Sequence, residues 1–227
     1  MNFFRALIYA ALIGASSLAA GAEFSAKVIA VLDGDTVLVL RDGRLVKVRL
    51  AEIDAPEKVQ IFGEESSRSL SGMVLGKQVS VTSQAVDQYG RLVAHLGING
   101  LDVNTEQIRL GMAWEYSHFH RNRTLVALQK EARLAARGLW AFNDPIPPWK
   151  WRSLHPNTPR TTDPVAPARS KGTAPGATCG NKRFCPEMSS CEEAVHYMLQ
   201  CGLETLDGNG DGVPCEALCA PLPELRN

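Results

Sequence analysis

Cysteine is absent from the chain before Cys179, and the 24 basic and 24 acidic residues of the 227-residue sequence leave no net charge. A balanced charge gives no general basic field of the kind that holds duplex nucleic acid without regard to sequence. Beyond the N-terminal apolar run, no stretch could span a bilayer, and no internal repeat is visible. These absences argue against a strongly basic binder, a membrane-spanning protein and a repeat array.

The N-terminus carries the one long apolar run. Arg5 precedes an apolar stretch over residues 6–18, and small residues at Ala20 and Ala22 precede Glu23. This pattern predicts a signal peptide over residues 1–22 that is cleaved before Glu23. The alternative is an uncleaved anchor, but the run is shorter than the ~20 residues of a spanning helix. We therefore expect a secreted or periplasmic protein with no stable membrane insertion after cleavage.

Cysteine is concentrated at the other end of the chain. An even set within a short segment predicts disulfides and an oxidising compartment. Such bonds would stabilise a unit that is too small for a substantial core, and the sequence does not choose among the possible pairings. The residues concerned are Cys179, Cys185, Cys191, Cys201, Cys215 and Cys219.

Hydrophobic periodicity predicts an α+β, mainly β domain over residues 23–152. Strands are expected at 24–32, 37–40, 45–50, 78–83 and 92–98, and helices at 63–75, 103–110 and 124–137. This order fits a five-stranded OB-fold barrel with three helices. Residues 153–177, rich in Pro, Thr, Ala and Arg, are predicted to be a disordered linker. A small disulfide-rich domain with a helix over 190–199 would follow at 178–219, with a tail at 220–227.

Charged groups recur where the predicted strands end. Asp35 and Asp54 would follow neighbouring strands and could share a hard cation such as Ca²⁺ or Mg²⁺. Arg49 and Arg91 offer planar forks that match phosphate oxygens, and Glu57 is left as a base for water. Each residue alone has an ordinary interpretation as a turn, a cap or a surface ion pair. Their joint occurrence favours a metal-assisted phosphodiesterase.

Two further segments contain side chains that could bind a metal ion. Residues 207–216 place oxygen-bearing side chains at alternate positions between glycines, as in a loop that surrounds a hard cation, although a plain Asx/Gly turn cluster is the alternative. The His118–Phe119–His120 segment lacks a further partner at ligand spacing, so we interpret it as a surface loop rather than a metal site.

Three segments together resemble the thermonuclease (staphylococcal nuclease-like) family: Asp33-Gly34-Asp35-Thr36, Arg49-Leu50-Ala51-Glu52-Ile53-Asp54-Ala55-Pro56-Glu57 and Asp87-Gln88-Tyr89-Gly90-Arg91. The resemblance implies a Ca²⁺-dependent nuclease that cuts DNA and RNA and leaves 3′-phosphate ends. It implies Asp35, Asp54 and the backbone carbonyl of Ala55 as calcium ligands, Arg49 and Arg91 as phosphate clamps, and Glu57 as general base. Ala55 stands where the family's best-known member has Thr, which leaves the carbonyl in place. Tyr89 and Tyr116 are the residues we expect to contact the nucleotide.

Residues 207–216 resemble the loop of the excalibur domain, an extracellular calcium-binding module. The resemblance implies Asp207, Asn209, Asp211 and Glu216 as ligands of a second calcium ion. Asn209 stands where the motif usually has Asp, so it keeps a ligand oxygen and loses a charge.

The sequence therefore predicts an extracytoplasmic calcium-dependent nuclease, with a nucleic acid substrate and an unknown envelope partner for its C-terminal domain. One alternative is a catalytically silent barrel that binds nucleic acid without cutting it. The other is a calcium-dependent envelope interaction protein.

Overall fold

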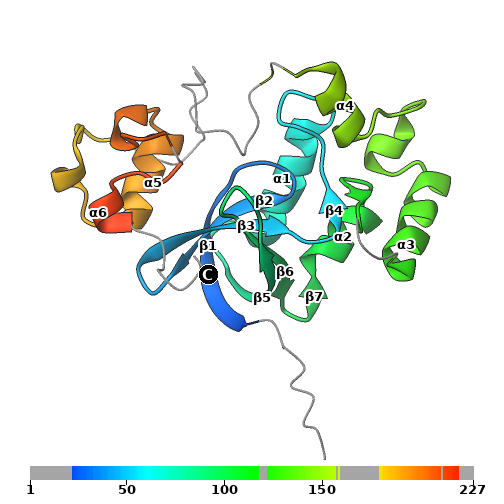
Figure 1. Ribbon diagram of the computed structural model, residues 1–227, viewed down its shortest axis with the longest axis horizontal. Coiled ribbons are helices and arrows are strands. Elements are labelled where there is room, and N and C mark those ends of the chain that lie inside the picture. Colours follow the sequence, from blue (N-terminus) through cyan, green and yellow to red (C-terminus); the bar gives the residue numbers. More distant parts are fainter. Residues whose placement is uncertain (1–21, 118–121, 157, 159–178, 211, 220–227) are drawn as a thin grey trace, which may run out of the picture.

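The computed structural model describes residues 22–117, 122–156, 158, 179–210 and 212–219. The signal peptide predicted over 1–22, the His118–Phe119–His120 segment, most of the predicted linker, Asp211 and the tail lie outside the described residues, Ala22 excepted. Figure 1 shows a barrel with helices on one side and a smaller C-terminal region on the other.

Among the described residues, no helix combines the length and apolar character needed to cross a membrane.

Five strands form a closed barrel, as the sequence predicts. Antiparallel pairs join them in the order β3-β2-β1-β5-β6, and a parallel pairing of β3 with β6, from Val48↔Leu92 to Leu50↔Ala94, closes the sheet. A two-residue strand, β7, continues from β6. The bounds are β1 Glu23–Val31, β2 Thr36–Arg41, β3 Arg44–Leu50, β5 Gln78–Val86, β6 Leu92–Ile98 and β7 Leu101–Asp102.

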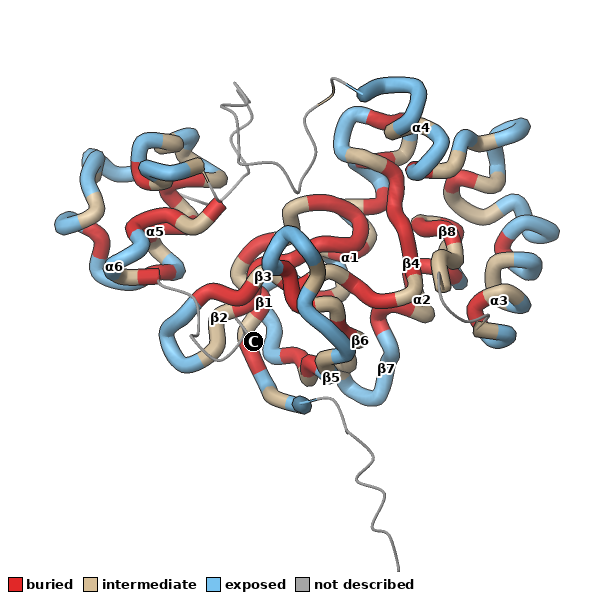
Figure 2. Tube along the Cα trace, in the orientation of Figure 1, coloured by how far each residue is buried: buried red, intermediate tan, exposed pale blue. Residues whose placement is uncertain are grey.

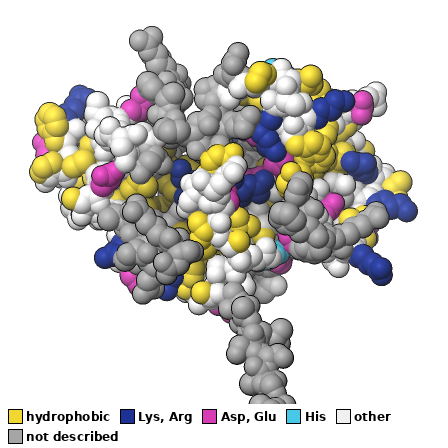
Figure 3. Space-filling model, viewed as in Figure 1, with side chains coloured by type: hydrophobic (Ala, Val, Ile, Leu, Met, Phe, Trp, Pro, Cys, Tyr) yellow, Lys and Arg dark blue, Asp and Glu magenta, His cyan; other side chains and the backbone are white. Residues whose placement is uncertain are grey.

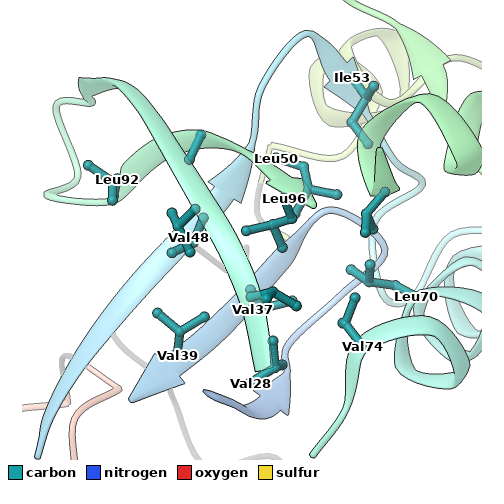
Figure 4. Close-up of a cluster of buried hydrophobic side chains, with 14 of the residues drawn as sticks. Val28, Val37, Val39, Val48, Leu50, Ile53, Leu70, Val74, Leu92 and Leu96 are labelled. Carbon is teal, nitrogen blue, oxygen red and sulfur yellow. The ribbon is translucent and has the colours of Figure 1, made fainter. Parts of the chain in front are cut away.

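The barrel interior is filled by alternate strand residues. Val37 and Val39 of β2 point inward and are fully buried, as the two-residue period of a strand requires (Figure 4). Leu70 and Val74 of α1 (Gly63–Val74) belong to the same core, together with residues of α2 (Val103–Arg109) and α3 (Arg123–Leu134). The helices thus complete the hydrophobic core that holds the strand ends in place.

Side-chain caps define where two of these helices begin. Asp102 accepts a hydrogen bond from the backbone amide of Thr105 at the start of α2, and Asn122 caps α3 in the same way. The predicted extent of α3, to Arg137, was wrong by three residues. The helix ends at Leu134 because Ala136 adopts a left-handed conformation, with φ of 49°, that a helix cannot include.

Besides β7, four elements of residues 22–156 have no counterpart in the predicted set. The two-residue strand β4 (Ile53–Asp54) pairs with β8 (Trp114–Glu115). The short 3₁₀ helix η1 (Gly138–Ala141) follows α3. Helix α4 (Pro148–Leu154) begins with a proline at its first position and reaches into the segment that we expected to be linker.

The C-terminal region is held by three disulfides: Cys179–Cys201, Cys185–Cys215 and Cys191–Cys219. No free cysteine remains, so the prediction that all six are paired is confirmed. Around the bonds lie η2 (Cys185–Glu187), α5 (Cys191–Leu199), η3 (Glu204–Leu206) and α6 (Glu216–Cys219).

The C-terminal region packs against the outside of the barrel. Leu38 lies between the inward-pointing Val37 and Val39 and so faces outward, yet it is fully buried. It forms one hydrophobic cluster with Ala30 and Leu45 of the barrel and with α5, α6 and η3. Figure 2 shows buried segments both in the barrel strands and along α5. An ion pair from Lys27 to Glu192, 2.7 Å long, lies at this contact.

Candidate active site

A polar cavity of about 150 Å³ lies between the ends of the barrel strands and α4. In Figure 3, basic and acidic side chains gather on this face between the barrel and α4. Four carboxylates and three guanidinium groups meet there, with Tyr89 at one side. The lining residues are Asp33, Asp35, Arg49, Asp54, Ala55, Pro56, Glu57, Tyr89, Arg91 and Arg152.

Asp35 is held by the turn between β1 and β2. Its backbone amide donates to Oδ1 of Asp33 at 2.9 Å, and its own Oδ1 accepts from the hydroxyl of Thr36 at 2.9 Å. Its Oδ2 accepts from the backbone amide of Ala55 at 2.8 Å. The first acidic loop is therefore tied directly to the second.

Gly34 allows this turn to lie flat against the helices. A Cβ atom at this position would lie 1.9 Å from Oγ of Ser66 and 2.7 Å from Cβ of Ala55. The Gly34 carbonyl accepts a hydrogen bond from Nε2 of the buried Gln107 at 2.7 Å. The position of Asp35 thus depends on close contact with α1 and α2.

Arg49, at the end of β3, holds the turn that leads to Asp54. Its Nη1 donates to the carbonyls of Leu50 and Ile53 at 3.0 and 2.9 Å. Its Nη2 lies 3.1 Å from Asp54 and 3.5 Å from Asp35, so one nitrogen faces both carboxylates. Burial lowers the pKa of Arg49, but Asp35 and Asp54 outweigh this and raise it above its usual value. The guanidinium therefore stays charged.

Asp54 is the most deeply buried carboxylate of the cavity, with 1% of its surface exposed. Burial raises its pKa above the ordinary value, while the hydrogen bond from Arg152 lowers it. The nearby charge of Asp35 raises the pKa further. Two buried carboxylates repel each other, and nearby positive charge offsets this repulsion.

Arg91 and Tyr89 come from the turn between β5 and β6. Both oxygens of Asp87 are used to hold this turn. One accepts from the backbone amides of Tyr89 and Arg91 at 3.0 Å, and the other from Nε of Arg91 at 2.8 Å. Arg91 is thereby fixed with its guanidinium 5.5 Å from the Tyr89 ring, and half of the Tyr89 surface is exposed.

Glu57 follows the Pro56 turn, and its side chain meets a residue that the sequence reasoning missed. Nη1 of Arg152 donates to Glu57 at 2.7 Å, and Nη2 donates to Asp54 at 2.7 Å. Burial lowers the pKa of Arg152, but the contacts with Asp54 and Glu57 raise it overall. The helix signal at Pro147–Pro148 and the apolar Trp149 and Trp151 were the available clues to this element.

Tyr116 does not line this cavity. Its ring stacks on Trp149 of α4, with centroids 5.3 Å apart and an angle of 29° between planes. It lines a second cavity with Trp114, Glu115 and Pro147. Of the two tyrosines predicted to contact nucleotide, the structure brings only Tyr89 to the acidic cluster.

Three of the four predicted ligands of the C-terminal loop lie among the described residues, and two of them are in contact. Asp207 accepts hydrogen bonds from the amides of Gly210 and Gly212 at 2.9 and 2.7 Å. The side chains of Asn209 and Glu216 contact each other. Asp211 lies outside the described residues.

A closed five-stranded barrel with carboxylates and guanidinium groups at its strand ends defines a nuclease-type OB barrel. A family model described as "Staphylococcal nuclease homologue" matches residues 47–142, and one described as "Excalibur calcium-binding domain" matches residues 182–216. The chain belongs to the staphylococcal nuclease family and carries an Excalibur calcium-binding domain.

Similar proteins occur in several bacteria. An "Uncharacterized endonuclease" of Escherichia coli O157:H7 is 42% identical over 132 residues, which are 58% of this chain and 86% of that protein. "Protein ParB" of Escherichia coli is 39% identical over 163 residues, covering 63% and 92%. A "Micrococcal nuclease" of Shigella flexneri is 35% identical over 161 residues, covering 66% and 92%. The first matched family region ends before α4, so Arg152 lies outside it.

Proposed function

We propose that this protein is a calcium-dependent endonuclease that hydrolyses phosphodiester bonds of DNA and RNA outside the cytoplasm. The observation that carries the proposal is the meeting of Asp35, Asp54, Glu57 and two arginines around one cavity, from three separate loops. Relatives named as an endonuclease and a nuclease support the same activity.

The donor set suits a calcium ion. Asp35 and Asp54 offer carboxylate oxygens, which hard cations prefer, and Ala55, whose backbone carbonyl would be a further ligand, lines the same cavity. A guanidinium group already lies 2.7 Å from Asp54, and this ion pair supports a cation position beside that carboxylate. When bound there, calcium would neutralise negative charge on the phosphate oxygens.

The side chains of the cavity divide the remaining work. Arg49 and Arg91, each oriented by its own hydrogen bonds, would hold the phosphate oxygens and stabilise the charge that grows on them. Glu57 would accept the proton of the attacking water. The water oxygen would then bond to phosphorus as the bond to the 5′ oxygen breaks. The 5′ oxygen would take up a proton from solvent, and the phosphate would stay on the 3′ side. Tyr89, exposed beside Arg91, would contact the sugar or base.

Location outside the cytoplasm is supported by the three disulfides and the Excalibur domain. We propose the boundaries 1–22, 23–152, 153–177 and 178–219 for signal peptide, barrel domain, linker and Excalibur domain, with a tail at 220–227. Calcium in the second loop would use Asp207, Asn209, Asp211 and Glu216, and an envelope partner would bind this domain.

The deciding experiment is digestion of single- and double-stranded DNA and RNA over a calcium series, with the product ends identified. We expect 3′-phosphate ends, no cleavage with chelator, and a loss of about two to four orders of magnitude for Glu57→Gln. A Glu57→Gln protein with full turnover would refute the role of Glu57. A folded protein that binds nucleic acid without cutting it would instead establish the silent barrel.

A further inference from the structure

Helix α4 lines the proposed active site through Arg152 and the second cavity, beside Tyr116, through Trp149. Arg152 reaches Asp54 through both terminal nitrogens, at 2.7 and 3.2 Å, and Glu57 at 2.7 Å. Three residues earlier, Trp149 stacks on Tyr116. Residues three apart lie on the same face of a helix, so one short element fills both positions.

The contacts of Arg152 are those of a cation held by carboxylates. Charge-assisted hydrogen bonds to a carboxylate that is almost fully buried are strong, and the guanidinium uses both Asp54 oxygens. Asp54 is a residue to which we assign calcium, and Glu57 is the proposed base. Arg152 therefore ties up a metal ligand and the base at once.

Of its seven residues, helix α4 buries only Pro148, so its attachment depends largely on polar and aromatic contacts that a ligand can displace. Gln60 donates from its side chain to the carbonyl of Ile146 at 2.7 Å, next to the Pro147–Pro148 start of the helix. Trp149 and Leu154 are exposed, with 40% and 58% of their surfaces accessible. The helix has seven residues, and so short a helix is marginal without tertiary contacts.

We propose that α4 is an autoinhibitory element, in which Arg152 occupies the cation position and Trp149 covers Tyr116 until calcium and nucleic acid displace them. This inference rests on the proposed function of the cavity. When only a fraction of the protein molecules is in the binding-competent state, the apparent affinity for the ligand is reduced in proportion to that fraction. Removing Arg152 therefore raises the apparent calcium affinity, and calcium in turn loosens α4.

The test measures calcium binding and helix opening rather than cleavage. The full chain carries Asp207→Ala and Glu216→Gln, so that calorimetry reports the barrel site alone. In this background, Arg152→Ala binds calcium about tenfold more tightly. Lys150→Ala, which removes one exposed positive charge from the same helix, leaves the affinity within about twofold.

Hydrogen exchange gives the second readout. Calcium increases the exchange of the amides of residues 150–155 in the Lys150→Ala protein, whereas in Arg152→Ala they exchange fast with or without calcium. Arg152→Gln, which keeps a similar length, guards against a folding defect in the alanine variant.

The outcomes separate the two claims. Equal or weaker calcium binding by both Arg152 variants than by Lys150→Ala, or unchanged exchange of α4, overturns the autoinhibitory role and leaves the proposed function standing. Absence of any calcium binding that Asp54→Asn abolishes overturns the proposed function, and this inference falls with it.

Discussion

The carboxylate of Asp35 accepts a hydrogen bond from the backbone amide of Ala55, 20 residues further along the chain, at 2.8 Å. This bond joins the β1–β2 turn to the residue that follows Asp54. The distance between the two acidic loops is therefore set by a residue that we also assign to the metal. Substitutions of Asp35 can therefore separate the effect of its charge on calcium binding from the effect of its hydrogen bond on stability.

Asp35→Asn keeps an oxygen that can accept from Ala55 and loses the negative charge. We expect the unfolding free energy to change by less than about 1 kcal/mol, while calcium affinity at the barrel falls by about tenfold or more. Asp35→Ala leaves the buried amide of Ala55 without its acceptor and costs about 1–3 kcal/mol in addition. Urea denaturation and calorimetry measure the two effects. Equal calcium affinity in wild type and Asp35→Asn would remove Asp35 from the ligand set.

Alanine substitutions at two glycines should change stability in opposite directions. Gly34→Ala places a methyl group 1.9 Å from Ser66 Oγ, so we expect a loss of about 2 kcal/mol or more and a weaker calcium site. Gly72→Ala lies in the exposed interior of α1 with nothing within 4 Å, and should gain about 0.5–1 kcal/mol. Thermal unfolding of the pair measures both. A neutral Gly34→Ala would show that the turn can move away from α1.

His95 makes folding stability depend on pH. Its hydrogen bond to Asp102 raises its pKa, against the effect of burial, and Glu52 adds to the rise. A raised histidine pKa contributes stability below the unfolded value of about 6.5, and this stability is lost as pH rises through the folded value. Burial raises the pKa of Asp102, but the bond to His95 lowers it overall, so its contribution is lost only in acid.

We therefore expect His95→Gln to remove up to about 1 kcal/mol near pH 5.5 and much less at pH 8.5, because the pair is partly exposed. Denaturation across this range is the measurement. A penalty that does not vary with pH would show that His95 acts through packing alone.

Leu38 tests the packing of the C-terminal region on the barrel. Leu38→Ala should cost about 2–5 kcal/mol with the disulfides intact, because the side chain is fully buried under α5. Leu101→Ala, at a 40% exposed position, should cost under about 0.5 kcal/mol. When the disulfides are reduced, the Leu38 penalty should shrink. A penalty that is the same in both redox states would show that Leu38 is covered without help from the disulfides.

The sequence predicted those elements whose hydrophobic pattern repeats over several residues. β6 was expected at 92–98 and is found there, because alternation over seven residues is a strong local signal. β4 was missed because two residues carry no period, and its partner Trp114 lies about sixty positions away. Such a pairing is set by tertiary contacts alone.

In the candidate site, too, residues with a local sequence signal were predicted, and residues placed by distant contacts were missed. Asp35, Asp54, Glu57 and the two arginines could be named because they lie at strand ends in a familiar order. Arg152 could not, because it reaches Asp54 across 98 positions and its neighbours suggested a linker. Tyr116 was predicted near the substrate from its place in the sequence, but its ring direction depends on Trp149, which belongs to the same missed helix.

The position of the disulfide-bonded region has a consequence for how the chain matures. Every strand that closes the barrel precedes residue 99, whereas the groups that cover Ala30, Leu38 and Leu45 come after residue 184. Domains commonly fold in order as the chain emerges. The newly closed barrel therefore exposes an apolar strip until the C-terminal region packs on it and the disulfides form. During that interval the strip is a suitable binding site for a chaperone.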